Sequence, residues 1–153
     1  PTQILSDIFT IEEIKKKSIH NLNICWIGDS NNVLNSLIEA SVKFSFNLKI
    51  GSPKKYEPSK SLINWAKKNK SKIKIFNDAK KAILNSDIVF ADKFIGVYDK
   101  SNRKKKIKDF KNFQVNSELM SYANKKAIFL HCLPASRGQE VSAKVIDGKQ
   151  SKV

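Results

Sequence analysis

Short apolar runs alternate along this chain with longer segments of helical periodicity, and this alternation limits the possible fold more than any other feature. Each run spans three to six residues, which is too short for a stable helix but sufficient for a strand buried in a sheet. The predicted strands cover residues 22–27, 48–50, 73–76, 88–91 and 127–130.

The segments between these runs carry apolar residues at helical spacing, as at Val33, Leu37 and Ile38. Ser59 and Asp78 are residue types that cap helices, and each stands at the start of such a segment. The predicted helices cover residues 2–17, 31–46, 59–70 and 78–85. No hairpin dipeptide joins the strands, so we expect right-handed crossover connections and parallel pairing. The predicted fold class is α/β, a Rossmann-like three-layer domain with a parallel sheet of about five strands.

The length of 153 residues fits one domain, and a hydrophobic content of 41% supports an ordinary core. Neither an internal repeat nor a low-complexity linker divides the chain, so residues 1–153 are expected to form one unit. The chain begins at Pro1 without an initiator methionine and stops at Val153, where a further strand could begin. These borders favour a piece of a longer enzyme.

A formal net charge of +15 makes nucleic acid the first partner to consider. Arginine is the residue that recognises phosphates and guanine edges in a bidentate way, yet it occurs only as Arg103 and Arg137. Lysine is abundant throughout the chain, so a basic nucleic-acid-binding domain is kept only as a less favoured alternative. The densest basic run, residues 103–106, is predicted to be the solvated face of a helix.

The two cysteines, Cys25 and Cys132, fall in or just after predicted buried strands. Nothing in the sequence resembles a secretory signal, and no apolar run is long enough to cross a bilayer. We therefore expect a cytoplasmic protein with reduced thiols and no membrane partner.

Polar residues follow three of the predicted strands at their carboxyl ends. They are the segment 28–32, with Asn31 and Asn32, then Asp92, and then the segment 131–134, with His131 and Cys132. Parallel strands share one direction, so these groups are expected to open on one edge of the sheet, where ligands of such sheets bind. Amides at a helix N-terminus suit a carboxylate, and Asp92 suits a cationic group.

Each candidate also has a structural interpretation. Asn31 fits a helix cap, Asp92 a turn former, His131 a hydrogen-bonded core histidine and Cys132 an inert buried thiol. A dinucleotide fingerprint, a Walker loop and metal-type spacing of Cys and His are all missing from the sequence. We therefore expect neither a metal nor an organic cofactor.

Six segments together resemble the ornithine carbamoyltransferases. Residues 26–32, Trp-Ile-Gly-Asp-Ser-Asn-Asn, match a family segment in which a glycine stands at Ser30, and residues 53–58, Pro-Lys-Lys-Tyr-Glu-Pro, match a family loop. Pro-Thr-Gln at residues 1–3 matches the end of a His-Pro-x-Gln motif. Gln-Val-Asn at 114–116, His-Cys-Leu-Pro at 131–134 and Val-Ile-Asp-Gly at 145–148 follow in the family order.

This resemblance covers essentially the whole chain and implies a two-domain enzyme, usually a homotrimer, that belongs to arginine biosynthesis. Such an enzyme transfers a carbamoyl group from carbamoyl phosphate to the side-chain amine of ornithine and releases citrulline and phosphate. Residues 1–153 would be its second, amino-acid-binding domain, without the carbamoyl-phosphate domain. No cofactor is implied.

The same resemblance implies roles for single residues. Asn32, with Asn31 beside it, would hold the backbone of ornithine and Asp92 its α-amino group. Cys132 and Leu133 would lie beside the side-chain amine and the carbamoyl group, and Gln3 would contribute on the carbamoyl-phosphate side. The predicted catalytic set is Cys132, Asp92 and His131.

The segment after Asp92 departs from the family pattern. The family has Asp-x-x-x-Ser-Met-Gly there, whereas this chain has Gly96 and Val97 in the place of the serine and methionine that close over ornithine. The pattern is closer to a loop of putrescine carbamoyltransferases, whose substrate has no carboxylate. Ornithine is the favoured substrate, with Gly96 and Val97 as substrate-binding residues. Putrescine or another amine is the alternative, and a relative that binds an amino acid without turnover is a third possibility.

Overall fold

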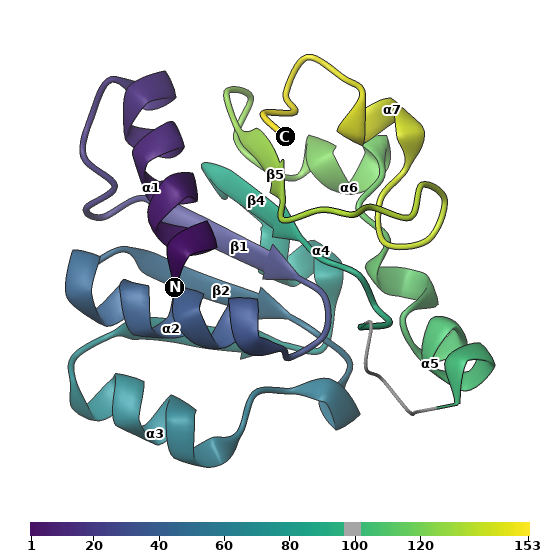
Figure 1. The fold of residues 1–153 in the computed structure, drawn as a ribbon, viewed down its shortest axis with the longest axis horizontal. Coiled ribbons are helices and arrows are strands. Elements are labelled where there is room, and N and C mark those ends of the chain that lie inside the picture. Colours follow the sequence, from purple (N-terminus) through teal and green to yellow (C-terminus); the bar gives the residue numbers. More distant parts are fainter. Residues whose placement is uncertain (97–101) are drawn as a thin grey trace.

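The computed structural model describes residues 1–96 and 102–153 and contains a five-stranded parallel sheet (Figure 1). The strands lie in the order β3-β2-β1-β4-β5, and every neighbouring pair is parallel. Their bounds are β1 Asn23–Ile27, β2 Asn47–Gly51, β3 Lys72–Phe76, β4 Ile88–Ala91 and β5 Ile128–His131. The predicted fold class is confirmed, and each strand lies within about one residue of its predicted range.

Helices cover both faces of this sheet. One face carries α1 (Thr2–Lys15), α2 (Asn32–Phe44) and α3 (Lys60–Lys68), which pack on strand residues such as Trp26 and Leu48. The opposite face packs on Cys25 and Ile27 and carries α4 (Ala79–Ile83), α6 (Ser117–Ser121) and α7 (Ala143–Ile146). The remaining elements are α5 (Arg103–Asp109) and two short 3₁₀ helices, η1 (Lys54–Tyr56) and η2 (Lys111–Phe113).

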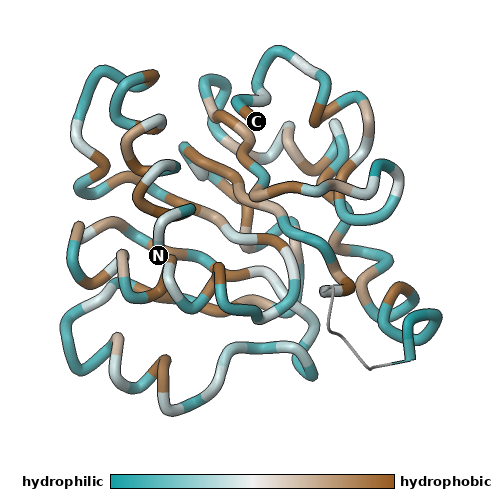
Figure 2. Tube along the Cα trace, in the orientation of Figure 1, coloured by the Kyte–Doolittle hydropathy of each residue, from teal (hydrophilic) through white to brown (hydrophobic). Residues whose placement is uncertain are grey.

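Alternate residues of each strand therefore face two separate hydrophobic cores. Trp26, Leu34 and Phe46 are at most 1% exposed in the first core, and Phe110 and Phe129 are fully buried in the second. Figure 2 shows hydrophobic residues gathered along the strands and on the helix faces that look inward. A sheet covered on both sides explains why its strands read as nearly continuous apolar runs.

Several helix ends differ from the prediction for local reasons. Helix α1 stops at Lys15 because Lys16 takes a left-handed conformation, and α2 stops at Phe44 because Ser45 does the same. Phe46, which we placed in the apolar stripe of the second helix, instead lies buried just beyond its end. Helices α6 and α7 were not predicted, because five and four residues are too few to show a helical period.

The chain reaches a further strand-like pairing at its end. The Phe129 N–H donates to the Gln150 carbonyl at 2.8 Å, and the Lys152 N–H donates to the Phe129 carbonyl at 2.9 Å. Ser151 thus forms a parallel bridge beside β5. This pairing lies where the sequence suggested that a further strand could begin.

Strands β1 and β4 are parallel neighbours at the centre of the sheet, and the order in which successive strands are added reverses there. Strands β2 and β3 extend the sheet to one side of β1, and β4 and β5 extend it to the other. After β1 the chain enters α2 on one face, whereas after β4 it turns to the opposite face, where Phe94 packs with Phe110. The loops after these two strands separate and leave a crevice. In open α/β sheets this topological switch point is the usual ligand site.

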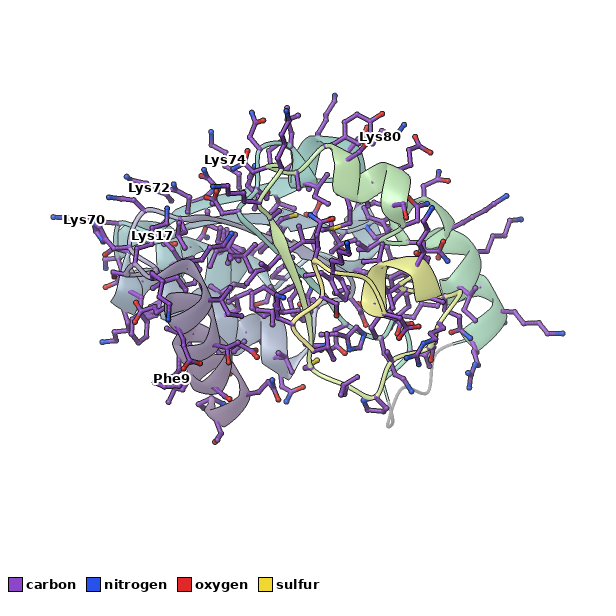
Figure 3. The ribbon with its side chains drawn as sticks, turned by 90° about the horizontal axis from the view of Figure 1, so that it is seen from above. Phe9, Lys17, Lys70, Lys72, Lys74 and Lys80 are labelled. Atoms are coloured by element: carbon purple, nitrogen blue, oxygen red, sulfur yellow. The ribbon has the colours of Figure 1, made fainter. Side chains whose placement is uncertain are left out.

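Lysines protect the β3 edge of the sheet. Lys72 and Lys74 are exposed on this strand, and Figure 3 shows both extending outward together with Lys70. Charged side chains on an edge strand hinder pairing with a second chain. None of the helices in the described part of the chain combines the length and the apolar character that crossing a bilayer requires.

Gly51 provides a test of how closely β2 packs on the second core. A Cβ atom at this position would lie 2.6 Å from Cδ1 of Ile27 and 2.9 Å from Cβ of Ala82, closer than side chains tolerate. We predict that Gly51→Ala lowers the free energy of unfolding by about 1–3 kcal/mol, measured by urea denaturation. Gly96→Ala is the matched control, because a Cβ there meets nothing within 4 Å. Equal midpoints for the two variants would contradict this packing.

Candidate functional site

A cavity of about 640 Å³ opens at the carboxyl ends of β1, β4 and β5. All three polar segments predicted from the sequence contribute to it, and the first turn of α1 adds Gln3. The lining residues are Gln3, Asp29, Asn31, Asn32, Val33, Asp92, Lys93, Gly96, Lys106, Cys132, Leu133 and Pro134. The structure therefore brings the separate strand-end motifs to one site at the switch point.

Asn31 joins the loop after β1 to the loop after β4. Its Oδ1 accepts the N–H groups of Val33 and Leu34, both at 3.0 Å, and this caps α2. Its Nδ2 donates to Oδ2 of Asp92 at 2.5 Å. The interpretation of Asn31 as a helix cap is thus confirmed, and the same amide also positions the acid. A direct role of Asn31 in binding substrate stays a prediction.

Asp92 is held from two sides at the mouth of β4. Besides the Asn31 amide, the backbone N–H of Lys93 donates to Oδ1 at 2.7 Å, and the residue is 9% exposed. A carboxylate oxygen can accept more than one hydrogen bond, so Asp92 keeps acceptor capacity toward the cavity. The result is an oriented negative charge that a ligand meets without further rearrangement.

Asn32 lies beside this acid with its amide open. The side chain is exposed, lines the cavity and makes no hydrogen bond to any residue in the described ranges. It stands at the start of the 13-residue helix α2, where unpaired backbone N–H groups create a partial positive charge. The pair Asn32 and Asp92 thus offers donors for an anionic group next to an acceptor for a cationic one.

Cys132 lies against Asp92 at the end of β5. Burial, followed by the negative charge of Asp92 and a hydrogen bond to it, raises the pKa of the Cys132 thiol well above its usual range. The group therefore stays a neutral thiol at physiological pH and is a poor nucleophile. Leu133 follows with a left-handed backbone, φ 45°, and a side chain that is 55% exposed in the cavity lining.

His131 is buried, and it stabilises the loop after β5 through a hydrogen bond. Its Nδ1 accepts the Leu133 N–H at 2.9 Å, so Nε2 carries the proton and faces Oε1 of Glu140 at 3.3 Å. Glu140 also accepts the N–H of Ser136 at 2.5 Å. The histidine is 5% exposed and is absent from the cavity lining, which favours a structural role, and a catalytic role of His131 stays a prediction.

Lys106 is a cavity residue that the sequence reasoning missed. The run 103–106 was predicted to be a solvated helix face, but Lys106 is 5% exposed, and its Nζ lies 2.5 Å from Oδ2 of Asp29. The same Nζ lies 5.2 Å from the ring centroid of Tyr56. One signal was present in the sequence: Phe110 is apolar and stands four residues later, directly after α5, which favours the same inward-facing side for Lys106.

A possible metal-ligand group is also present within the described ranges. Ligand atoms of Asp92, His131 and Cys132 all lie within 4.8 Å of one another. Nδ1 of His131 already accepts the Leu133 N–H, and both oxygens of Asp92 already accept hydrogen bonds. A metal ion bound by all three residues would have to displace the bond at Nδ1 of His131, so the donor set fits loop architecture better than metal binding.

The remaining predicted residues divide into two groups. Gln3 and Gly96 both line the cavity, Gln3 from the first turn of α1 and Gly96 from the loop after β4. Val97 lies outside the described residues. Of the predicted pair Gly96 and Val97, the structure therefore places only Gly96 at the cavity, and their contact with substrate stays a prediction.

Comparison with known proteins identifies the family of this chain. A family model described as "Aspartate/ornithine carbamoyltransferase, Asp/Orn binding domain" matches residues 20–153. Ornithine carbamoyltransferase of Methanobrevibacter smithii is 43% identical over 157 aligned residues, which cover 100% of this chain and 52% of that protein. The enzyme of the same name from Ruthia magnifica is also 43% identical, over 100% of this chain and 50% of its own length.

Solved structures agree with the sequence comparison. Ornithine carbamoyltransferase from Pyrococcus furiosus superimposes with a TM-score of 0.91 at 34% identity and covers 100% of this chain and 50% of that one. The anabolic enzyme from Campylobacter jejuni gives 0.90 at 38% identity, covering 96% and 50%. The chain thus spans about half the length of the relatives that it matches. It belongs to the aspartate/ornithine carbamoyltransferase family, whose Asp/Orn-binding domain it matches over residues 20–153.

Proposed function

We propose that residues 1–153 are the amino-acid-binding domain of an ornithine carbamoyltransferase. The enzyme transfers a carbamoyl group from carbamoyl phosphate to the side-chain amine of ornithine and forms citrulline and phosphate. The observation that carries this proposal is the meeting of Asn32, Asp92 and Cys132 in one cavity at the switch point. Relatives named ornithine carbamoyltransferase, at about 43% identity, support the same activity.

The charges of the cavity suit the backbone of an amino acid. Asp92 offers an oriented carboxylate to the α-ammonium group, and hydrogen bonds between charged groups are the stronger kind. Asn32 and the N-terminus of α2 offer N–H donors to the α-carboxylate. A zwitterion gripped at these two points extends its side chain along the cavity toward Cys132 and Leu133.

The chemical step requires a neutral amine held close to the carbonyl carbon. A new C–N bond forms as the amine attacks, the C–O bond to phosphate breaks, and the departing phosphate takes up the proton that the amine loses. Cys132 stays a thiol beside this amine and therefore does not stabilise its protonated form as a thiolate would. Holding both reactants in place supplies much of the rate enhancement for such a step. Gln3 would contact the carbamoyl-phosphate side, and a separate domain would bind the phosphate.

The wider setting follows from the same proposal. The full protein would act as a cytoplasmic homotrimer in arginine biosynthesis, with carbamoyl phosphate and ornithine as its small-molecule substrates. It would require neither a metal nor an organic cofactor and would have neither nucleic acid nor membrane as a partner. Size-exclusion chromatography with light scattering would test the trimer directly.

Gly96 is the observation that favours a second substrate class. It lines the cavity, and open space surrounds the position where a side chain would begin. A loop without a polar side chain at this point makes fewer hydrogen bonds to an amino acid and leaves more space for a diamine. Putrescine or another amine is therefore the alternative substrate.

Steady-state assays of the full-length protein with each amine test this choice. We expect citrulline formation from ornithine to have a kcat/KM at least about tenfold above that of carbamoylputrescine formation from putrescine. The physical reason is that putrescine has no α-carboxylate for Asn32 and α2 to bind, and each charged hydrogen bond contributes about 1.5–3 kcal/mol. A preference for putrescine would overturn the ornithine assignment while leaving the reaction class intact.

The role of Asp92 is tested by Asp92→Asn in the full-length protein. Removing the charge that binds the α-ammonium should raise the KM for ornithine about 10- to 100-fold, since such a bond contributes about 1.5–3 kcal/mol. Asp147→Asn is the control, because Asp147 forms an exposed ion pair with Arg137, away from the cavity lining. An ornithine KM that is equal in the Asp92→Asn variant and the wild type would refute this role.

The chain by itself should show no citrulline formation. Its cavity presents groups for the amino acid, whereas the residues that hold the phosphate of carbamoyl phosphate are proposed to lie in another domain. A colorimetric citrulline assay of purified residues 1–153, with the full-length protein as the positive control, measures this. Turnover by residues 1–153 would show that the chain contains a complete site.

A further inference from the structure

Asp7 is a buried acid directly behind the cavity, and nothing in the proposed reaction uses it. It lies in the second turn of α1 and is 8% exposed. Nε2 of Gln3 donates to its Oδ1 at 2.9 Å, and no cation forms an ion pair with it within residues 1–96 and 102–153. Asp7 thus lies on α1 one turn after Gln3, to which it is hydrogen-bonded, and Gln3 lines the cavity.

Burying this acid is unfavourable for the fold. Burial raises the pKa of Asp7 to about 6, and the hydrogen bond from Gln3 offsets only part of that effect. At physiological pH the side chain is therefore a carboxylate that has lost much of its hydration. A glutamine and an aspartate four residues apart would support a helix equally well on its exposed surface. A charge kept at such a position points to function more than to stability.

The chemistry of a carboxylate determines how the Gln3 amide lies. An ionised aspartate only accepts hydrogen bonds, so Gln3 must present its N–H₂ end to Asp7. The amide is planar, and its carbonyl oxygen then lies at the end turned away from Asp7. Gln3 itself lines the cavity together with Asp92 and Cys132. Within the described residues no group donates a hydrogen bond to this oxygen, so it remains available as an acceptor for a ligand.

We propose that Asp7 is a positioning residue that holds the Gln3 amide with its carbonyl oxygen toward the cavity, where this oxygen accepts an N–H of the carbamoyl group. The inference rests on the proposed function and adds a residue to it. Carbamoyl phosphate carries an N–H₂ group, which needs an acceptor, and among the lining residues Gln3 approaches from the α1 side. Asp7 touches neither substrate and acts only through Gln3.

The test uses the full-length enzyme with Asp7→Asn and Asp7→Leu. Asparagine can both donate and accept, so Gln3 can adopt both amide orientations, whereas leucine removes the anchor but keeps a similar volume. We expect the KM for carbamoyl phosphate to rise about threefold in Asp7→Asn and about tenfold in Asp7→Leu, the range for one neutral hydrogen bond. The KM for ornithine should stay within about twofold in both variants.

Thermal stability separates positioning from simple support of the fold. Both variants remove a desolvated charge, so we expect melting temperatures equal to or above that of the wild type at pH 8, where Asp7 is ionised. Glu13→Gln is the matched control on the same helix, because Glu13 is exposed and should change neither the KM values nor the melting temperature. A lower melting temperature with an unchanged KM for carbamoyl phosphate would make Asp7 structural and overturn the proposal.

A double-mutant cycle with Gln3→Ala makes the test specific to this pair. If Asp7 acts through Gln3, Asp7→Asn should add no further change in the KM for carbamoyl phosphate once Gln3 is alanine. Additive effects on the KM for carbamoyl phosphate would overturn the proposal. If the Asp7→Leu variant does not fold, the KM of the Asp7→Asn variant provides the test. If the wild-type enzyme formed no carbamoylated amine, the proposed function itself would be refuted. That outcome is distinguishable from a failure of the Asp7 proposal, which is measured on an active enzyme.

Discussion

The hydrogen bond from Asn31 to Asp92 is the interaction on which the site depends. It joins the loops after β1 and β4, the two parallel strands at the topological switch point, and the same amide caps α2. Gly28, at φ 156°, lets these loops approach, because a Cβ there would already lie 3.3 Å from the Asp92 carbonyl oxygen. The acid is thus oriented by the fold before any ligand arrives, and this preorganisation limits the reorganisation that binding requires.

Polar and charged groups collect around this bond, while hydrophobic residues form the two cores on either side of the sheet. Lys106 and Asp29 form a nearly buried ion pair, Asp7 is a desolvated carboxylate, and Leu133 has a left-handed backbone. A non-glycine residue in that region costs about 1–3 kcal/mol. The two hydrophobic cores on either side of the sheet stabilise these features, which supports the assignment of this edge as the working face of the molecule.

The strands could be predicted from the sequence because the strands of a sheet buried on both faces consist almost entirely of apolar residues. Helices α6 and α7 show no such pattern, since each is about one turn long. Asn32, Asp92, Cys132 and Leu133 could be predicted to lie together because residues at the carboxyl ends of parallel strands meet at one edge, and all four line one cavity. His131 shared the same position in its strand, yet its ring turns inward to Glu140, and no strand-end rule states which way a side chain turns.

The sequence by itself determined the fold class, the direction of the strands and the edge at which the polar motifs gather. These properties depend on local periodicity and on the alternation of helices and strands, and both can be recognised from residues that are close together in the sequence. Only the tertiary structure decided that Lys106 is buried against Asp29, that the Asn31 amide reaches Asp92, and that Asp7 is buried. Each of these facts depends on the environment of a side chain, which comes from elements distant in the chain and becomes defined only when they pack together.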